Sequence, residues 1–351
     1  MLIYTLIVLF LAQQGDVKGE TQPPLSPEIL KKTPPSPVVP PEKALDTFRI
    51  APGFRLELVA AEPLIHDPIA YAFDAAGRMF VIEMRGFMPD LEGKGENAPV
   101  GRVVMLEDTD GDGRMDRATV FLDGLVQPRA IAVASGGVLV AEPPNLWFCK
   151  DTRGDGRCDQ KTLVDGAYCP ARSNPEHAAN GLLPAVDNWF YNANSTWRYR
   201  FVGGQWSRSH TRFRGQWGIT QDDLGRLFFN YNTIFLRGDL VPCYAAQAHS
   251  RLSTSVNLDL TPEQTTWPVR PTPGVNRGYR PGVLRPDGSI VETNSACSPV
   301  VHRGDALPGD CRGNVFVCDP SGNLVKRLIL EVRPDRIVPR DAYDKAEFLA
   351  S

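Results

Sequence analysis

One short pattern recurs five times along the chain: a turn, then a hydrophobic strand that ends at or near a polar residue. The five copies are GRMFVIE (77–83), GGVLVAE (136–142), DNWFYNA (187–193), GRLFFNY (225–231) and GNVFVCD (313–319). Another apolar strand precedes four of the copies, and two more strands follow each of the first three. Four short strands joined by Gly/Asp turns, repeated at roughly 40–50 residues, are typical of a β-propeller blade. We expect an all-β propeller of four-stranded blades, with about five blades visible and six in the complete ring.

The sequence outside the repeat defines the domain boundaries. Residues 2–12 are an apolar run too short to span a bilayer, so residues 1–19 are predicted to be a signal peptide or an N-terminal anchor. Residues 20–44 are rich in proline and are expected to form an extended linker. The propeller is expected over 45–351, with a long irregular insertion at roughly 233–297. The end of the chain carries no turn or strand signal that could close a ring, so we expect the propeller to be C-terminally incomplete.

Charge and the export signal narrow the possible partners. The net charge is −3 and the basic residues are scattered, so nucleic acid is not expected as a partner. Contact with a membrane is expected only through the N-terminal segment, and the location is expected to be periplasmic or secreted. In an exported protein, cysteines favour disulfides. Cys149 and Cys158 flank a tight turn and are the first expected pair, followed by Cys311 and Cys318.

Two stretches, EDTDGDGRMDRATVF (107–121) and KDTRGDGRCDQKTLV (150–164), repeat one arrangement of aspartates and glycines. We expect both to connect the third and fourth strands of successive blades. The first stretch offers a hard cation such as Ca²⁺ the carboxylates of Asp108, Asp110, Asp112 and Asp116 and the carbonyl of Arg114. We predict a structural Ca²⁺ site there, and the alternative is a polar hairpin turn. In the second stretch Arg153 replaces an aspartate and could take the place of the ion by pairing with Asp151, Asp155 or Asp159.

Polar residues near the ring axis are candidates for chemistry. The recurring strand ends on an acid in three copies, which predicts an axial polar patch of Glu83, Glu142 and Asp319. The alternative is that these acids simply begin turns. His177 stands just before the strands of the third blade, where a loop histidine can act as a general base.

From Phe48 onward the chain resembles a known family. The similar stretches are FRIAPGFRLELVAAEPLIHDPIAYAFDAAGRMFVIEMRGF, GRVVMLEDTDGDGRMDRATVFLDGL, AEPPNLWFCKDTRGDGRCD and QWGITQDDLGRLFFNYN. They resemble the planctomycete-type membrane-bound dehydrogenases, which are related to the glucose/sorbosone dehydrogenase quinoprotein propellers. The resemblance implies that His177 takes the proton of a substrate hydroxyl and that Arg214 contacts pyrroloquinoline quinone (PQQ). This chain departs from the pattern at Thr196, where relatives have the Asp that orients the histidine, and at Gly215, where they have Asn.

Three functions follow as hypotheses. The first is an exported sugar or alcohol dehydrogenase that uses PQQ and passes electrons to a cytochrome c, without a haem c domain in this chain. The second is a non-catalytic propeller that binds carbohydrate through tryptophans, namely Trp189, Trp197, Trp206 and Trp217. The third is a lactonase-like hydrolase in which Glu83, Glu142 or Asp319 holds a divalent metal ion.

Overall fold

The computed structural model describes residues 27–33, 35, 37–90, 92–134, 136–170, 175–248, 254–275 and 277–351. The predicted export segment, residues 1–19, lies outside them. No helix in this described part is long and apolar enough to cross a membrane.

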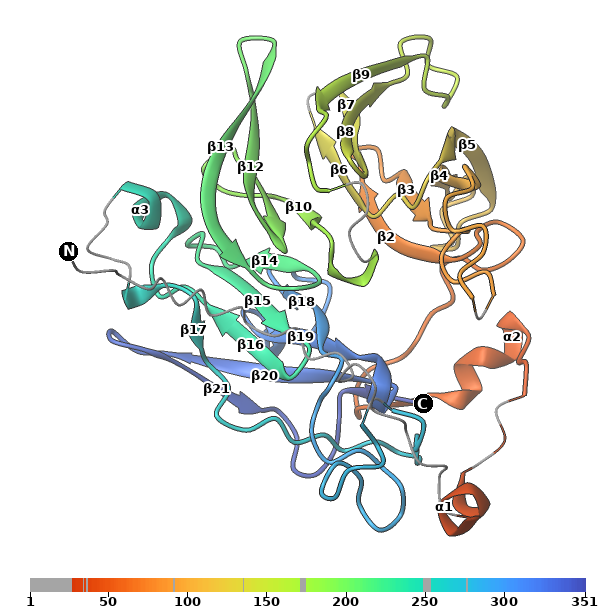
Figure 1. Ribbon diagram of the computed structural model, residues 1–351, viewed down its shortest axis with the longest axis vertical. Coiled ribbons are helices and arrows are strands. Elements are labelled where there is room, and N and C mark those ends of the chain that lie inside the picture. The colour runs from red at the N-terminus through yellow and green to blue at the C-terminus, as the bar shows by residue number, and fades with distance from the viewer. Residues whose placement is uncertain are drawn as a thin grey trace, which may run out of the picture.

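Five antiparallel sheets follow one another along the chain (Figure 1). The first sheet contains β2 (Pro68–Phe73), β3 (Met79–Glu83), β4 (Gly101–Glu107) and β5 (Arg117–Leu125). The second contains β6 (Ala130–Ala134), β7 (Gly137–Glu142), β8 (Asn145–Lys150) and β9 (Gln160–Asp165). The third contains β10 (Asn180–Pro184), β11 (Phe190–Ala193), β12 (Ser195–Val202) and β13 (Gln205–Arg214). The fourth contains β14 (Ile219–Gln221), β15 (Leu227–Tyr231), β16 (Ile234–Gly238) and β17 (Leu258–Asp259).

The fifth sheet has six strands and joins both ends of the described chain. Its strands are β18 (Cys297–Val301), β19 (Val315–Asp319), β20 (Leu324–Val332), β21 (Ile337–Asp341), β22 (Leu349–Ala350) and β1 (Arg49–Ile50). Strand β22 pairs with the start of β20 on one side and with β1 on the other. The expectation that the end of the sequence forms no strand is therefore wrong: β22 is a strand of two residues, and it pairs with β1 from the start of the domain.

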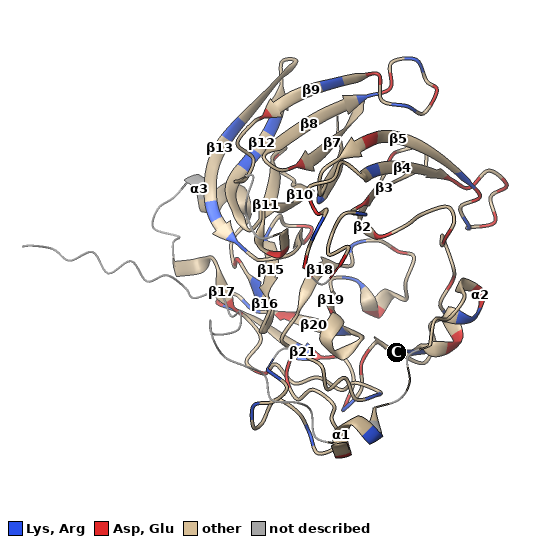
Figure 2. Ribbon diagram, turned by 45° about the vertical axis from the view of Figure 1, so that its right-hand side comes forward, with Lys and Arg blue, Asp and Glu red and all other residues tan. Residues whose placement is uncertain are grey.

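The core lies between successive sheets, as expected for propeller blades. One cluster of buried apolar residues joins the first and second sheets, a second joins the second and third, and two more join the third to the fourth and the fourth to the fifth. Burial on both faces explains why the second strands read as nearly continuous apolar runs. No such cluster of the described residues joins the fifth sheet to the first, and the ring is open there, with α2 at the rim of the gap (Figures 1 and 2).

Each copy of the recurring pattern is the second strand of its sheet, so the predicted blades are confirmed. The predicted insertion was placed too early, because β16 and β17 of the fourth sheet lie within it. The predicted linker is not extended throughout. It contains two short helices, α1 (Pro27–Lys32) and α2 (Pro41–Ala44), the second followed by the 3₁₀ turn η1 (Leu45–Thr47). Proline fits the first turn of α2, where its missing N–H has no partner to lose.

Strand order gives every sheet two distinct ends. At one end, which we call the entry end, the first strand begins, a turn connects the second strand to the third, and the fourth strand ends. At the opposite end, which we call the hairpin end, a hairpin connects the third strand to the fourth.

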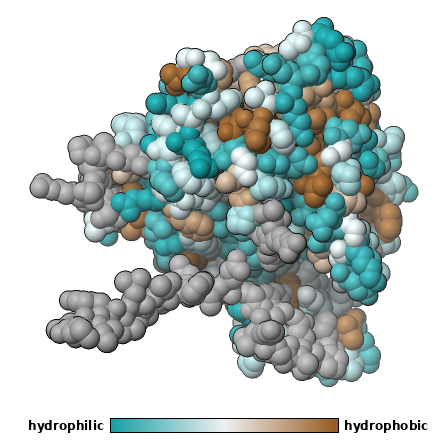
Figure 3. Space-filling model, turned by 45° about the horizontal axis from the view of Figure 1, so that its top comes forward, coloured by the Kyte–Doolittle hydropathy of each residue, from teal (hydrophilic) through white to brown (hydrophobic). Residues whose placement is uncertain are grey.

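On the face shown in Figure 3, apolar residues lie in small groups among hydrophilic ones. Three further short helical turns lie in connections: η2 (Pro175–His177), α3 (Cys243–Ala248) and η4 (Gly309–Cys311). A fourth, η5 (Pro320–Gly322), follows β19.

Candidate functional site

The aspartate loops lie at the hairpin end, between β4 and β5 and between β8 and β9, as predicted (Figure 2). In the first loop, carboxylate oxygens of Asp108, Asp110 and Asp116 lie within 4.8 Å of one another, which is the only such group in the described part of the chain. An all-oxygen set of this kind suits Ca²⁺. Asp112 is outside the group, and its carboxylate accepts a hydrogen bond from the N–H of Arg114 at 2.7 Å. The structure therefore brings part of the predicted ligand set together, and Ca²⁺ binding stays a prediction.

The second loop contains its own cation. Arg153 Nε lies 3.1 Å from Asp159 Oδ2, and its Nη2 lies 3.4 Å from Asp155 Oδ2. Asp151 instead accepts hydrogen bonds from the backbone N–H groups of Gly154 and Gly156, at 2.7 Å each. Arg153 therefore pairs with two of the three predicted acids, Asp155 and Asp159.

Cys149 and Cys158 are free thiols in the structure. Their mutual hydrogen bond lowers the pKa of Cys158 to about 7 and, together with burial, raises the pKa of Cys149. The expected disulfide is not formed here and stays a prediction. The second expected pair, Cys311 and Cys318, is not formed here either and stays a prediction; in the register of β18 and β19, Cys318 stands opposite Cys297.

The three acids of the predicted axial patch belong to separate local networks. Glu83 is fully buried and pairs with Arg102, at 2.5 Å between Glu83 Oε2 and Arg102 Nε. Glu142 accepts a hydrogen bond from Trp147 Nε1 at 2.8 Å. Asp319 caps the turn η5, where its Oδ1 accepts from Ser321 N at 3.0 Å. Among the described residues these acids form no metal-ligand group, so the divalent site of the lactonase hypothesis is not assembled from them.

His177 ends the turn η2 at the entry end of the third sheet, and it is half-buried. Its Nδ1 lies 2.7 Å from the amide nitrogen Nε2 of Gln216. An amide nitrogen only donates, so Nδ1 is the acceptor and the proton of the neutral ring lies on Nε2. A ring in this tautomer presents an N–H donor, whereas the general base expected from the resemblance needs a lone pair on Nε2.

Arg129, which the sequence analysis did not single out, supports the same turn. Its Nη1 donates to the carbonyl of Pro175 at 3.0 Å and so ties the second sheet to η2. The side chain is buried and has no carboxylate partner among the described residues, and burial lowers its pKa. No local sequence signal marks such a contact, because its two ends are 46 positions apart.

Arg214 is not available to a cofactor. Its side chain is 1% exposed, and Nε and Nη2 donate to Asp239 Oδ2 at 3.0 and 2.8 Å. Its Nη1 donates to the hydroxyl of Thr211 and the carbonyl of Arg212, both at 3.1 Å. A guanidinium with its donors engaged on three sides serves to hold β13 against the segment that follows β16. This residue therefore does not fit the PQQ contact predicted for it.

A cavity of about 580 Å³ opens at the entry end of the third sheet, next to the second. Among the described residues its lining carries no charged side chain and consists of Pro144, Gly166, Ala167, Tyr168, Cys169, Pro170, Ala179, Asn194, Ser195, Thr196, Trp197 and Phe213. We call it the third-sheet cavity. Phe213, the aromatic residue of the lining at the end of β13, is 43% exposed. The Nδ2 of Asn194 is buried and has no hydrogen-bond partner, so the wall of the cavity holds an unused donor.

The four tryptophans expected to stack on sugars are placed differently. Trp197 lines the third-sheet cavity, but the ring of His210 stacks on it at 3.8 Å. Trp189 lies against the guanidinium groups of Arg198 and Arg200, at 4.2 and 4.5 Å. Trp206 packs among phenylalanines of the second and third sheets. Trp217 does not line the cavity. Phe213, which the sequence analysis missed, is the aromatic side chain with an open face.

The family follows from a comparison over most of the chain. A family model described as "Domain of unknown function (DUF7133)" matches residues 40–351. The chain belongs to this family. No curated protein sequence matches the DUF7133 chain. The match begins close to the predicted start of the propeller at 45.

Several solved structures are similar to the DUF7133 chain at low identity. An AA12-family carbohydrate-active enzyme from Trichoderma reesei is 11% identical, with a TM-score of 0.49 over 87% of this chain and 88% of that one. The PQQ domain of a pyranose dehydrogenase from Coprinopsis cinerea is 12% identical, with a TM-score of 0.47 over 87% and 86%. A gluconolactonase from Xanthomonas campestris is 14% identical, with a TM-score of 0.34 over 50% and 57%. These likenesses are too distant to carry the role of any residue to this chain.

Proposed function

We propose that the protein binds a neutral, polyhydroxylated small molecule, such as a sugar or a sugar alcohol, in the third-sheet cavity. The observation that carries the proposal is the chemistry of the lining: an exposed aromatic ring and an unpartnered amide donor, in a wall whose described residues carry no charge. A charged ligand would lose hydration here without gaining a charged partner among these residues. A sugar can place its C–H face on Phe213 and a hydroxyl oxygen on Asn194 Nδ2.

The neighbouring polar groups suit the same ligand class. Thr196 is exposed at the start of β12 and adds a hydroxyl that both donates and accepts. The PQQ hypothesis gave this position to an orienting carboxylate, which Thr196 cannot replace. The turn that carries His177 leads directly into Ala179 of the cavity wall. The geometry therefore supports binding better than it supports proton abstraction.

Binding is tested by isothermal titration of the full chain with D-glucose and with D-sorbitol. We expect saturable binding that the substitution Phe213→Ala weakens by about 5- to 10-fold, since an aromatic platform contributes roughly 1 kcal/mol or more. Phe73→Ala is the matched control, because Phe73 is an exposed phenylalanine of the first sheet. Equal loss in both variants, or no binding by the folded protein, would count against the proposal.

The substitution Gln216→Glu examines dehydrogenase activity separately. A carboxylate at this position accepts a hydrogen bond from Nδ1–H of His177 and so favours the tautomer with the proton on Nδ1, which leaves the lone pair on Nε2 and makes that atom available as a base. We expect any sugar oxidation with an artificial electron acceptor to be absent or slow in the wild type and to rise in this variant. Fast oxidation in the wild type that the variant lowers would contradict the tautomer described above.

A further inference from the structure

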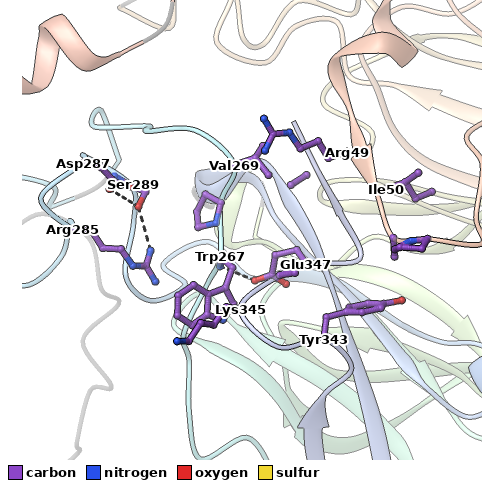
Figure 4. Close-up of a pocket in the computed structure, with 15 residues that line it drawn as sticks. Arg49, Ile50, Trp267, Val269, Arg285, Asp287, Ser289, Tyr343, Lys345 and Glu347 are labelled. Carbon is purple, nitrogen blue, oxygen red and sulfur yellow. Dashed lines mark hydrogen bonds between the residues drawn. The ribbon is translucent and has the colours of Figure 1, made fainter.

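A second cavity of about 580 Å³ lies on the fifth sheet, far along the chain from the first (Figure 4). We call it the fifth-sheet cavity. It lies between the start of the domain, the irregular segment before β18 and the segment between β21 and β22. Residues from these three segments line it: Arg49, Ile50, Ala51, Pro52, Trp267, Pro268, Val269, Arg285, Asp287, Ser289, Tyr343, Lys345, Ala346, Glu347 and Ala350.

Glu347 is a buried carboxylate that the protein satisfies only in part. Its side chain is 1% exposed. Oε1 accepts a hydrogen bond from the N–H of Trp267 at 2.8 Å and lies 3.2 Å from Lys326 Nζ. Oε2 is buried and has no partner. Lys326 is shared with Asp341, at 3.1 Å, so its charge is divided between two acids. Burial outweighs these contacts and raises the pKa of Glu347 to about 7.

Two cations of the same lining have no acid partner. Arg49 and Lys345 are exposed, and neither forms an ion pair within the described residues. Arg285, by contrast, is held by the protein, since its guanidinium lies 4.9 Å from the centre of the Trp267 ring and donates to Ser289 Oγ at 3.3 Å. Asp287, the second acid of the lining, accepts hydrogen bonds from the N–H and the hydroxyl of Ser289. Among its described residues the cavity therefore combines two cations without an ion pair at its edge with one unused acceptor, Glu347 Oε2, in its wall.

Candidate ligand classes differ in which of these groups they leave without a partner, and one class satisfies both the cation and the acceptor. A neutral sugar would use Glu347 Oε2 but leave the cations idle, and a simple anion would use the cations but leave Oε2 buried and unpaired. We propose that the fifth-sheet cavity binds a small hydroxylated anion, whose hydroxyl donates to Glu347 Oε2 and whose negative group faces Lys345, which lies on the same side of the cavity as Glu347 (Figure 4). This site does not depend on the third-sheet cavity.

The test is isothermal titration of the full chain with D-gluconate, D-glucose 6-phosphate and neutral D-glucose. Gluconate and glucose 6-phosphate carry the same chemistry from a carboxylate and from a phosphate, so the two arms show which anion is preferred. We expect at least one of them to bind, and Lys345→Asn to weaken that binding about 3- to 10-fold. Asparagine suits the left-handed backbone of Lys345, whose φ is 47°. Lys94→Asn, at an exposed lysine in the connection between β3 and β4, is the control.

Glu347→Gln is the second variant and removes the carboxylate without changing its shape. We expect a loss of about tenfold for the anion that binds, and no effect on D-glucose bound in the third-sheet cavity. The rim variant Lys345→Asn is at the surface, so it keeps the test valid if Glu347→Gln fails to fold. Anion affinity that neither variant changes, or binding of neither anion by the folded protein, would overturn the proposal.

Discussion

The two aspartate loops share one framework. The loop at 108–116 and the loop at 151–159 both connect a third to a fourth strand. Asp108 accepts hydrogen bonds from two glycine N–H groups at 2.7 and 2.8 Å, and Asp151 does the same at 2.7 Å each. In both loops a threonine hydroxyl is bound to the last aspartate. The backbone architecture is therefore independent of which cation, if any, the loop holds.

The loops differ in where positive charge comes from. The first has Asp110 at the position where the second has Arg153. In the first loop three carboxylates lie close together, and none of them forms an ion pair among the described residues. In the second loop the guanidinium of Arg153 pairs with Asp155 and Asp159. A charged group that is paired within the protein stabilises the fold. A charged or polar group without such a partner is a candidate to bind a ligand from solution. The same distinction separates the satisfied Arg214 from the two cavities.

The largest expected effect is the response of the first loop to Ca²⁺. At free Ca²⁺ about a hundredfold above its Kd, binding stabilises the folded state by about 2.7 kcal/mol. For a domain of about 300 residues that corresponds to a rise of roughly 4 °C in Tm relative to protein in chelator. We expect Asp110→Arg to abolish this rise, because it copies the second loop. Asp112→Asn should keep it, because Asp112 is outside the ligand group. The measurement is thermal unfolding of each variant with and without Ca²⁺. If Ca²⁺ raised the Tm of the Asp110→Arg variant as much as that of the wild type, the proposed difference between the two loops would be wrong.

The reverse substitution, Arg153→Asp, has a smaller expected effect. It removes two exposed ion pairs and adds a negative charge, so the free energy of unfolding in chelator should fall by up to about 1 kcal/mol. Ca²⁺ should then restore stability through the second loop, in a background that carries Asp110→Arg in the first. Denaturant unfolding of the double variant measures this directly. A stability that Ca²⁺ does not restore would show that the second loop lacks some other ligand.

The smallest effect concerns Cys158, which stands where the first loop has Met115. The pKa of Cys158 is lowered to about 7 in the folded state, below the usual thiol range near 8.5. Its contribution to stability is therefore present above about pH 8.5 and is lost as the pH falls through 7. We expect the free energy of unfolding to drop by less than about 1 kcal/mol over that interval under reducing conditions, since the thiol is half-exposed. Cys158→Ser should flatten this part of the pH profile, and a profile that the substitution leaves unchanged would refute the assignment.

Much of the fold could be read from the sequence because its signals are local. Gly/Asp turns and alternating apolar runs placed the strands of the first three sheets and the second strands of all five. The fifth sheet was harder, because β22 and β1 are two residues each and pair across almost the whole chain. Strands this short have no periodicity to detect.

The candidate site could be predicted only in part, because its decisive contacts are long-range. His177 stood out by context, but its partner Gln216 is 39 positions away and reverses the expected tautomer. Arg214 matched a motif, yet its pairing with Asp239 follows from the packing of two sheets. The unused donor of Asn194 and the open face of Phe213 are properties of burial, which no residue pattern reports.

The most direct test of the central claim compares D-glucose binding by two variants, Asn194→Asp and Asn188→Asp. Both asparagines have a left-handed backbone, with φ of 53° and 62°, and lie at opposite ends of the third sheet. The aspartate keeps the shape and removes the amide donor. Asn194→Asp should weaken binding at least about fivefold, since a lost partner costs roughly 1–3 kcal/mol, and Asn188→Asp should leave it unchanged. Equal affinity in both variants would show that the third-sheet cavity is not the sugar site.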